Sequence, residues 1–429
     1  MASSPARSGL LITASTVLAN LPAYLVPVLA AHRLGPDDVG ALATVLALAA
    51  ILTVPGVGLQ TAIAVVTARS GVPPERAVGW SRGIAVACGA LPLVLTPVLW
   101  SALRLPPAVP PLLAALVVAA VLAGRPLGVL QGTERFGRLA AGTVLLAAGR
   151  YAGALAAVAA GSGPAPATAA TALTCWLILP ALWWLARPPA PSTPAPSTPA
   201  PSTPVGVPSV SAGVLRGRLV LSSAGASLAI LVASYADVLL ARLLLPPRES
   251  GAYAVGAVLT RIAIWAPQAV TVVALPRLAR GPARPAPGTP AAHPDAAGAP
   301  DRATSALIAG LALLAGSGLL LVTLVAVAGG PLVRLIGGPG YPGTARLAYG
   351  FALAGAAYAM TFFLVNARIA VGSRFPSAGV WTAAVLLATA AIVLRPSTIG
   401  GILVLAVAAA VLSALLTALP AATRITAAR

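Results

Sequence analysis

The sequence predicts an all-α, polytopic membrane protein of about twelve transmembrane helices in two six-helix lobes. Apolar runs of about 20 residues, the length that crosses a bilayer, recur from end to end. Of the 429 residues, 59% are hydrophobic and only 8% are charged, whereas about a quarter of the residues of a typical soluble domain are charged. A helix–turn–helix pattern also occurs once in each half of the chain. An outer-membrane barrel would instead show short alternating segments.

Each apolar run is expected to form one membrane-crossing helix. The runs cover residues 8–31, 38–67, 78–103, 108–130, 138–160, 166–186, 214–245, 251–275, 303–329, 344–366, 376–394 and 400–420. Arg7 and the small residues near Ala30 give the first run some features of a signal peptide. It is longer than the roughly 7–15 apolar residues of such a leader and begins the repeated pattern, so we interpret it as a retained helix.

Two Pro-rich stretches interrupt the apolar runs. Residues 188–212 contain the sequence PSTP three times at a spacing of five and are predicted to be an extended cytoplasmic linker. This linker separates an N-lobe, residues 1–187, from a C-lobe, residues 213–429. Within the C-lobe, the Pro/Ala/Gly-rich residues 281–300 are predicted to be a disordered cytoplasmic loop.

The net charge of +19 rests on 27 arginines, because the chain contains no lysine. On a soluble protein this charge would suggest nucleic-acid binding; here membrane topology explains it, and no nucleic-acid partner is expected. With the N-terminus in the cytoplasm, 18 arginines fall on cytoplasmic segments, seven fall outside, and Arg150 and Arg261 lie within helices. The positive-inside rule then predicts a multi-pass protein of the cell membrane with both termini in the cytoplasm.

The helix–turn–helix pattern repeats at a separation of 211 residues, and each copy joins two apolar helices through a PxxxG turn. The matched pairs are Tyr24 and Tyr235, Leu34 and Leu245, Pro36 and Pro247, Asp38 and Glu249, Gly40 and Gly251, Ala43 and Ala254, and Leu48 and Leu259. The first two helices of each half are therefore expected to correspond.

Polar residues follow one face of these helices in both halves. At helical spacing, they are Thr13, Thr16, Asn20 and Tyr24; Thr53, Gln60 and Thr67; Ser223, Ser227, Ser234 and Asp237; and Arg261, Trp265 and Gln268. Such residues often form hydrogen bonds between neighbouring helices. Because both halves place them alike, a second interpretation is that they form the walls of a shared water-accessible cavity.

Three ionisable residues lie inside predicted helices, where charge is costly and often functional. Arg150 follows Arg138 by twelve residues, which at 1.5 Å per residue places it about 18 Å deep, near the midplane. Asp237 is a candidate functional residue, and its structural alternative is an ion pair with Arg242 or Arg261. One acid for two central arginines leaves positive charge without an acidic partner, which favours an anionic ligand. The alternative for Arg150 is that it caps carbonyls or neighbouring helices within the N-lobe.

No enzyme, metal site or cofactor is predicted. Cys88 and Cys175 are expected to pack in apolar helices, and neither His32 nor His293 has partners at metal-ligand spacing. A membrane-embedded glycosyltransferase or polymerase would need clustered Asp, Glu or His residues. The eight acidic residues are scattered mostly over loops, so this is the least favoured function.

Three segments carry a family resemblance. They are RLGPDDVGALATVLALAAILTVPGVGLQTAIAVVTAR from Arg33, YADVLLARLLLPPRESGAYAVGAVLTRIAIWAPQAVTVVALPRL from Tyr235, and PLVRLIGGPGYPGTARLAYGFALAGAAYAMTFFLVNARIAVGS from Pro331. Together they resemble the polysaccharide-exporter (oligosaccharide flippase) branch of the multidrug/oligosaccharidyl-lipid/polysaccharide flippase superfamily. The resemblance implies two pseudo-symmetric six-helix lobes around a central cavity, lined largely by the first two helices of each half.

The resemblance also implies a function, the movement of an undecaprenyl-diphosphate-linked oligosaccharide across the cytoplasmic membrane by alternating access. The exported product would be an exopolysaccharide, capsule or cell-wall glycan. The expected substrate-binding residues are Arg261, Arg150, Trp265, Gln268, Asn20, Tyr24, Gln60 and Ser234, with Asp237 as the coupling candidate. Arg261 and Arg150 would hold the diphosphate, and Trp265 would pack on the first sugar or the carrier chain.

Two alternatives stay open. A multidrug and toxin extrusion-type cation antiporter would favour acidic residues in the cavity, and this chain places more arginines than acids there. A lipid II flippase would be expected to have fourteen helices rather than twelve. The expected partners are the lipid-linked glycan and membrane lipid, with a polysaccharide polymerase and glycosyltransferases as further candidates, and the protein is expected to be a monomer.

Overall fold

The computed structural model describes residues 21–70, 72–187, 212–265, 302–370, 373 and 375–426, without the side chains of residues 69, 212–224, 265, 302–306, 370 and 419–426. All regular structure in this part of the chain is helical, which confirms the predicted all-α class. Nine of the described segments are long and apolar enough to cross a membrane. Each of the twelve predicted apolar runs overlaps a described helix.

Nine helices form the N-terminal half of the described structure. They are residues 21–33, α2 (Pro36–Leu52), α3 (Val54–Ser70), α4 (Ala77–Val94), α5 (Thr96–Ser101), α6 (Val109–Leu122), α7 (Gly124–Gly132), α8 (Phe136–Ala159) and α9 (Pro164–Ala186). The pairs α2/α3 and α4/α5 each come from a single predicted run. Pro55 and Pro97 lie just after the two breaks. They account for these breaks, because proline lacks an N–H donor and its ring clashes with the carbonyl four residues earlier.

Seven helices form the C-terminal half of the described structure. They are α10 (Ala212–Leu244), α11 (Pro247–Trp265), α13 (Arg302–Gly337), α14 (Pro342–Arg346), α15 (Ala348–Ala370), α16 (Ala378–Leu394) and α17 (Ile399–Thr426). The repeated PxxxG turns mark the starts of α2 and α11. Both helices begin with proline and carry acidic residues in the first turn, which suits the positive end of the helix dipole.

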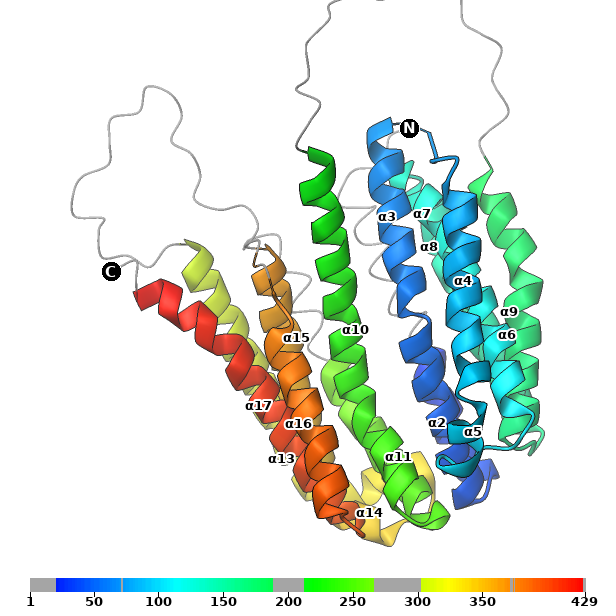
Figure 1. Ribbon diagram of the computed structural model, residues 1–429. Coiled ribbons are helices and arrows are strands. Elements are labelled where there is room, and N and C mark those ends of the chain that lie inside the picture. The colour runs from blue at the N-terminus through cyan, green and yellow to red at the C-terminus, as the bar shows by residue number, and fades with distance from the viewer. Residues whose placement is uncertain are drawn as a thin grey trace, which may run out of the picture.

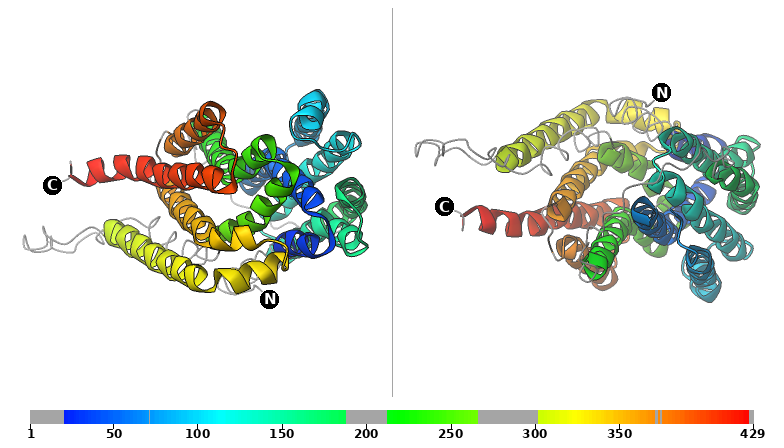
Figure 2. Two further views of the ribbon diagram at one scale, coloured as in Figure 1. Left: turned by 90° about the horizontal axis from the view of Figure 1, so that it is seen from below. Right: turned by 90° about the horizontal axis from the view of Figure 1, so that it is seen from above.

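The two halves stand side by side when viewed along the helix axes (Figure 2). Their ribbons come together at the end where α2 and α11 begin, the lower end in Figure 1, and diverge toward the other end. We call the lower end the contact end. There α2 packs against both α10 and α11. The last residues of α9 and the first of α10 lie at the opposite end (Figure 1), as the predicted topology requires for segments joined by the linker.

Within the N-terminal half, three glycines of α7 pack directly against the backbone of α3. A Cβ atom on Gly128 or Gly132 would lie 2.6 Å from the carbonyl oxygen of Gln60 or Ala64, respectively. Gly124 meets the carbonyl of Gly56 in the same way. Small residues that allow two backbones to approach closely are typical of helix pairs in membranes.

This packing determines where part of the predicted cavity face lies in the described structure. The sequence places Thr53, Gln60 and Thr67 on one face of a single helix, but the helix is interrupted at Thr53. In α3, after the break, the Gln60 Nε2 atom donates to Gln131 Oε1 at 3.1 Å, and Thr67 is buried against Gly132 of α7. Gln60 and Thr67 therefore face α7, because the close α3–α7 contact fixes the rotation of α3.

Candidate functional site

A pocket of about 110 Å³ lies between the two halves. Its walls come from the helix over residues 21–33 and from α2, α6, α8, α9, α10 and α11. The lining residues are Ala23, Tyr24, Pro27, Leu46, Ala49, Ala50, Thr53, Leu116, Arg150, Tyr151, Thr171, Tyr235 and Arg261. The structure thus brings together three of the predicted site residues: Tyr24, Arg150 and Arg261.

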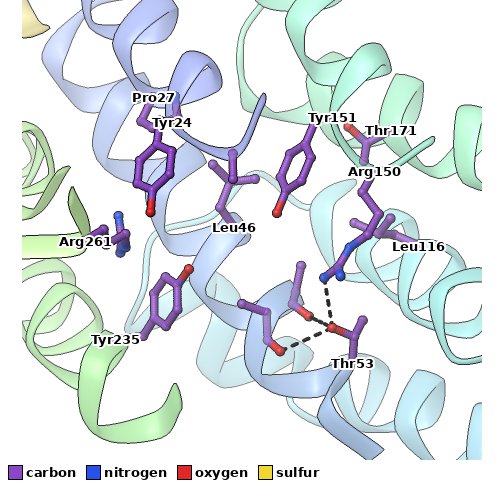
Figure 3. Close-up of a pocket in the computed structure, with 13 residues that line it drawn as sticks. Tyr24, Pro27, Leu46, Thr53, Leu116, Arg150, Tyr151, Thr171, Tyr235 and Arg261 are labelled. Carbon is purple, nitrogen blue, oxygen red and sulfur yellow. Dashed lines mark hydrogen bonds between the residues drawn. The ribbon is translucent and has the colours of Figure 1, made fainter. Parts of the chain in front are cut away.

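The pocket joins equivalent positions of the sequence repeat. Tyr24 and Tyr235 form one matched pair, and Ala50 and Arg261 have the same separation of 211 residues; all four line the pocket. Figure 3 shows the Tyr24 and Tyr235 hydroxyls directed into one space beside the Arg261 guanidinium, with Tyr151 on the other side of Leu46. At the first matched position each half contributes a phenol, Tyr24 or Tyr235, whereas at the second position the N-terminal half has Ala50 and the C-terminal half has Arg261.

Among the residues that the structure describes, two buried nitrogens of Arg261 have no hydrogen-bonding partner. Its guanidinium carbon lies 4.3 Å from the centroid of the Tyr235 ring, a cation–π contact. Nε and Nη2 are buried and form no hydrogen bond with any described residue, and the same is true of the Tyr24 hydroxyl. A buried donor left unsatisfied costs about 1–3 kcal/mol, so such a group in a native fold calls for an explanation. A bound acceptor in the pocket would supply one.

Arg150 is held by the neighbouring helix. Its Nη2 atom donates to the Thr53 hydroxyl at 3.0 Å, and that hydroxyl donates in turn to the Ala49 carbonyl at 2.8 Å. This hydrogen bond within the N-terminal half agrees with the structural alternative for Arg150. The side chain nevertheless lines the pocket. None of the described residues lining this pocket is acidic, so the pocket carries two guanidinium charges without a carboxylate.

Asp237 lies outside this pocket and is only 2% exposed. Its Oδ2 atom accepts a hydrogen bond from the Tyr253 hydroxyl at 2.9 Å, and Oδ1 accepts from the Val238 N–H at 2.8 Å. The expected alternative of an ion pair with Arg242 is wrong, because the Arg242 guanidinium binds backbone carbonyls of the other half instead. For Arg261, the described ring contact is with Tyr235, while its charge also interacts electrostatically with Asp237. The role of Asp237 in coupling stays a prediction.

The remaining predicted residues are not part of the pocket as described. Ser234 donates to the Ile230 carbonyl at 2.6 Å, and neither Ser234 nor Gln60 is among the lining residues. Asn20 and Gln268 lie outside the described residues, and the side chain of Trp265 is not described. Their roles stay predictions.

Sequence reasoning did not select Tyr151 or Tyr235 as binding residues; it placed Thr53 on the predicted cavity face without giving it a binding role, and Thr53 does line the pocket. Tyr235 had a usable signal, its match to Tyr24 in the repeat. Tyr151 follows Arg150 in an otherwise Ala- and Gly-rich stretch, which marks the position but does not indicate that it lines the same pocket as Tyr24.

No family model matches this sequence, and no curated protein matches it. Solved structures share its fold. A eukaryotic MATE transporter, AtDTX14, has a TM-score of 0.62 at 14% identity over 97% of this chain and 95% of that chain. An inward-facing multidrug resistance MATE family transporter of the MOP superfamily has a TM-score of 0.61 at 14% identity, over 96% of this chain and 95% of that one.

A third structure, a MOP superfamily transporter from Pyrococcus furiosus, has a TM-score of 0.54 at 16% identity over 99% of this chain and 97% of that chain. Its description reports a reverse polarity of the binding pocket and suggests a different function. These similarities define the class: a multi-pass helical membrane protein with the fold of MATE transporters of the MOP superfamily. They confirm the predicted fold and do not distinguish the polysaccharide-exporter branch.

Proposed function

We propose that this protein is an alternating-access transporter of the cell membrane for an undecaprenyl-diphosphate-linked oligosaccharide, and that the pocket receives the diphosphate. One observation carries the proposal. The pocket contains the Arg261 guanidinium, of which two buried nitrogens have no hydrogen-bonding partner in the described part of the chain. A phosphate group offers the acceptors and the negative charge that this site lacks.

The chemistry of the lining supports an anion. Guanidinium stays charged at physiological pH and presents its donors in a planar fork that matches phosphate oxygens. Arg150 adds a second positive charge, and the three tyrosine hydroxyls can donate to further oxygens. Because the phenols of Tyr24 and Tyr235 come from opposite halves, a ligand between them would contact both moving parts of the transporter.

The second candidate is a cation antiporter of the MATE type, which the fold fits equally well. The observation that favours it is Asp237, a buried carboxylate in an apolar helix. Against it stands the pocket itself, since two arginines and no acid line it. The solved transporter described as having a reversed pocket polarity supports the view that pocket charge varies on this fold. A lipid II flippase would also bind a diphosphate, so the pocket does not separate it from the first proposal.

Binding of a short prenyl diphosphate to the purified protein tests the pocket directly. We expect geranyl diphosphate to bind the wild type, and Arg261→Ala and Arg261→Lys to weaken binding by roughly 10- to 100-fold, since each charge-assisted hydrogen bond contributes about 1.5–3 kcal/mol. Arg150→Ala should weaken it less, because part of that guanidinium is already occupied by Thr53. In cells, both Arg261 variants should abolish glycan export at normal membrane levels.

Arg248→Ala is the matched control, because Arg248 is exposed and lies outside the pocket; it should bind geranyl diphosphate like the wild type. Wild-type affinity in Arg261→Ala would refute the headgroup assignment. Tighter binding of tetraphenylphosphonium than of geranyl diphosphate would favour the cation antiporter.

A further inference from the structure

We infer that Arg104 and Arg242 form a reciprocal clasp that holds the two halves together at the contact end, and that this clasp must open before the pocket can face outward. The inference rests on the proposed alternating-access transport. It concerns a region at the contact end, distinct from the pocket. The predicted topology places the contact end on the outer side of the membrane.

Arg242, near the end of α10, reaches from the C-terminal half into the N-terminal half. Its Nε atom donates to the Leu103 carbonyl at 3.0 Å, and Nη2 donates to the Arg104 carbonyl at 3.1 Å. Nη1 lies 3.4 Å from the Asp37 carbonyl and donates to the Ser250 hydroxyl of its own half at 3.1 Å. The side chain is only 4% exposed, so these contacts are shielded from water.

Arg104 makes the opposite connection. Its Nη2 atom donates to the Leu245 carbonyl at 3.2 Å and lies 3.5 Å from the Leu243 carbonyl, both at the end of α10. The Arg104 backbone has φ +49°, a left-handed conformation that is strained for a residue with a side chain. The same residue thus accepts a hydrogen bond from Arg242 through its carbonyl and donates back through its side chain, which explains why the strained backbone is retained.

The repeated glycines allow this contact. A Cβ atom on Gly40 would lie 2.8 Å from the Ser250 hydroxyl and 3.2 Å from Arg242 Nη1, and a Cβ on the equivalent Gly251 would collide with the Pro36 carbonyl. The PxxxG turns therefore bring the starts of α2 and α11 together beside the clasp. The two glycines and the two arginines therefore lie together at the contact end.

The clasp is specific to arginine and has no copy in the other half. Its acceptors across the halves are backbone carbonyls, and only a planar fork reaches several of them at once, which the single ammonium of lysine cannot do. The repeat equivalent of Arg242, 211 residues earlier, is Ala31. Breaking the clasp should consequently shift the transporter toward the state in which the contact end is open.

Labelling of a cysteine in the pocket measures that shift without any substrate. The reporter is Ala50→Cys, a lining position, in a chain whose Cys88 and Cys175 are replaced by alanine, and the probe is a membrane-impermeant maleimide added outside intact cells. Arg242→Lys and Arg104→Gly should each raise the labelling rate at least about tenfold, or about 1.4 kcal/mol in the conformational equilibrium. Glycine tolerates the left-handed backbone at position 104, so Arg104→Gly removes only the side chain. The control Arg248→Ala removes an exposed arginine near the same end and should leave the rate unchanged.

Unchanged labelling in both clasp variants at normal membrane levels would overturn the clasp, whatever the pocket binds. If Arg242→Lys does not reach the membrane, Arg104→Gly decides the question by itself. Faster labelling supports the clasp even where geranyl diphosphate fails to bind, so failure of the proposed function and failure of the clasp give different results.

Discussion

Removing the Tyr253 hydroxyl should reveal whether Asp237 is charged in the folded protein. Tyr253→Phe deletes one hydrogen bond of 2.9 Å to Asp237 and keeps the ring, which packs edge-on against Phe351 at a centroid distance of 5.0 Å. Tyr253 is 0% exposed and Asp237 2% exposed, so water cannot replace the lost donor. A hydrogen bond to a charged group contributes about 1.5–3 kcal/mol and one between neutral groups about 0.5–1.5 kcal/mol.

The measurement is a double-mutant cycle of unfolding free energies, with Tyr253→Phe, Asp237→Asn and the double variant purified in the same detergent. We expect a coupling energy of about 1.5 kcal/mol or more, in the range found for residues in direct contact. A coupling energy near zero would refute the Asp237–Tyr253 pair. Transport by Asp237→Asn tests the coupling role separately: full activity of a stable variant at all proton gradients would show that Asp237 is not the coupling residue.

Two further predictions concern packing and topology. Gly128→Ala should lower the free energy of unfolding by about 1–3 kcal/mol, because the new methyl group overpacks the α3–α7 contact; Gly79→Ala, where a Cβ meets nothing within 4 Å, should cost nothing, and equal thermal stability of the two variants would contradict the packing argument. A cysteine introduced as Ser197→Cys should react with an impermeant maleimide only after the cytoplasmic face is exposed, and labelling on intact cells would contradict the predicted orientation.

The fold was predictable because its determinants are local. The length of each apolar run, the Pro36 and Pro247 helix starts, and the acidic residues that follow them all act within a few residues of the chain. The repeat added one long-range element, the correspondence of Tyr24 and Tyr235. These features predicted the helices and three residues of the pocket, without any knowledge of how the helices are rotated.

Helix rotation and buried arginine contacts were not predictable for a physical reason. In α3, the seven-residue spacing shows that Gln60 and Thr67 share a face, but it does not show that this face meets the glycines of α7. Arg242 seemed peripheral because it lies beside a predicted outer loop. Its acceptors are backbone carbonyls of Leu103 and Arg104, and a carbonyl is present at every residue, so it leaves no sequence signal.

The close backbone contact between α3 and α7 has a mechanical consequence. Because the two main chains are in direct contact and Gln60 is hydrogen-bonded to Gln131 across the pair, we expect α3 and α7 to move as one rigid unit. Bending within the second apolar run is then confined to the joint at Thr53, where α2 ends. Arg150 donates a hydrogen bond to the Thr53 hydroxyl at this break. A ligand that draws the Arg150 guanidinium into the pocket would therefore also pull on Thr53, the residue about which α3 and α7 would tilt.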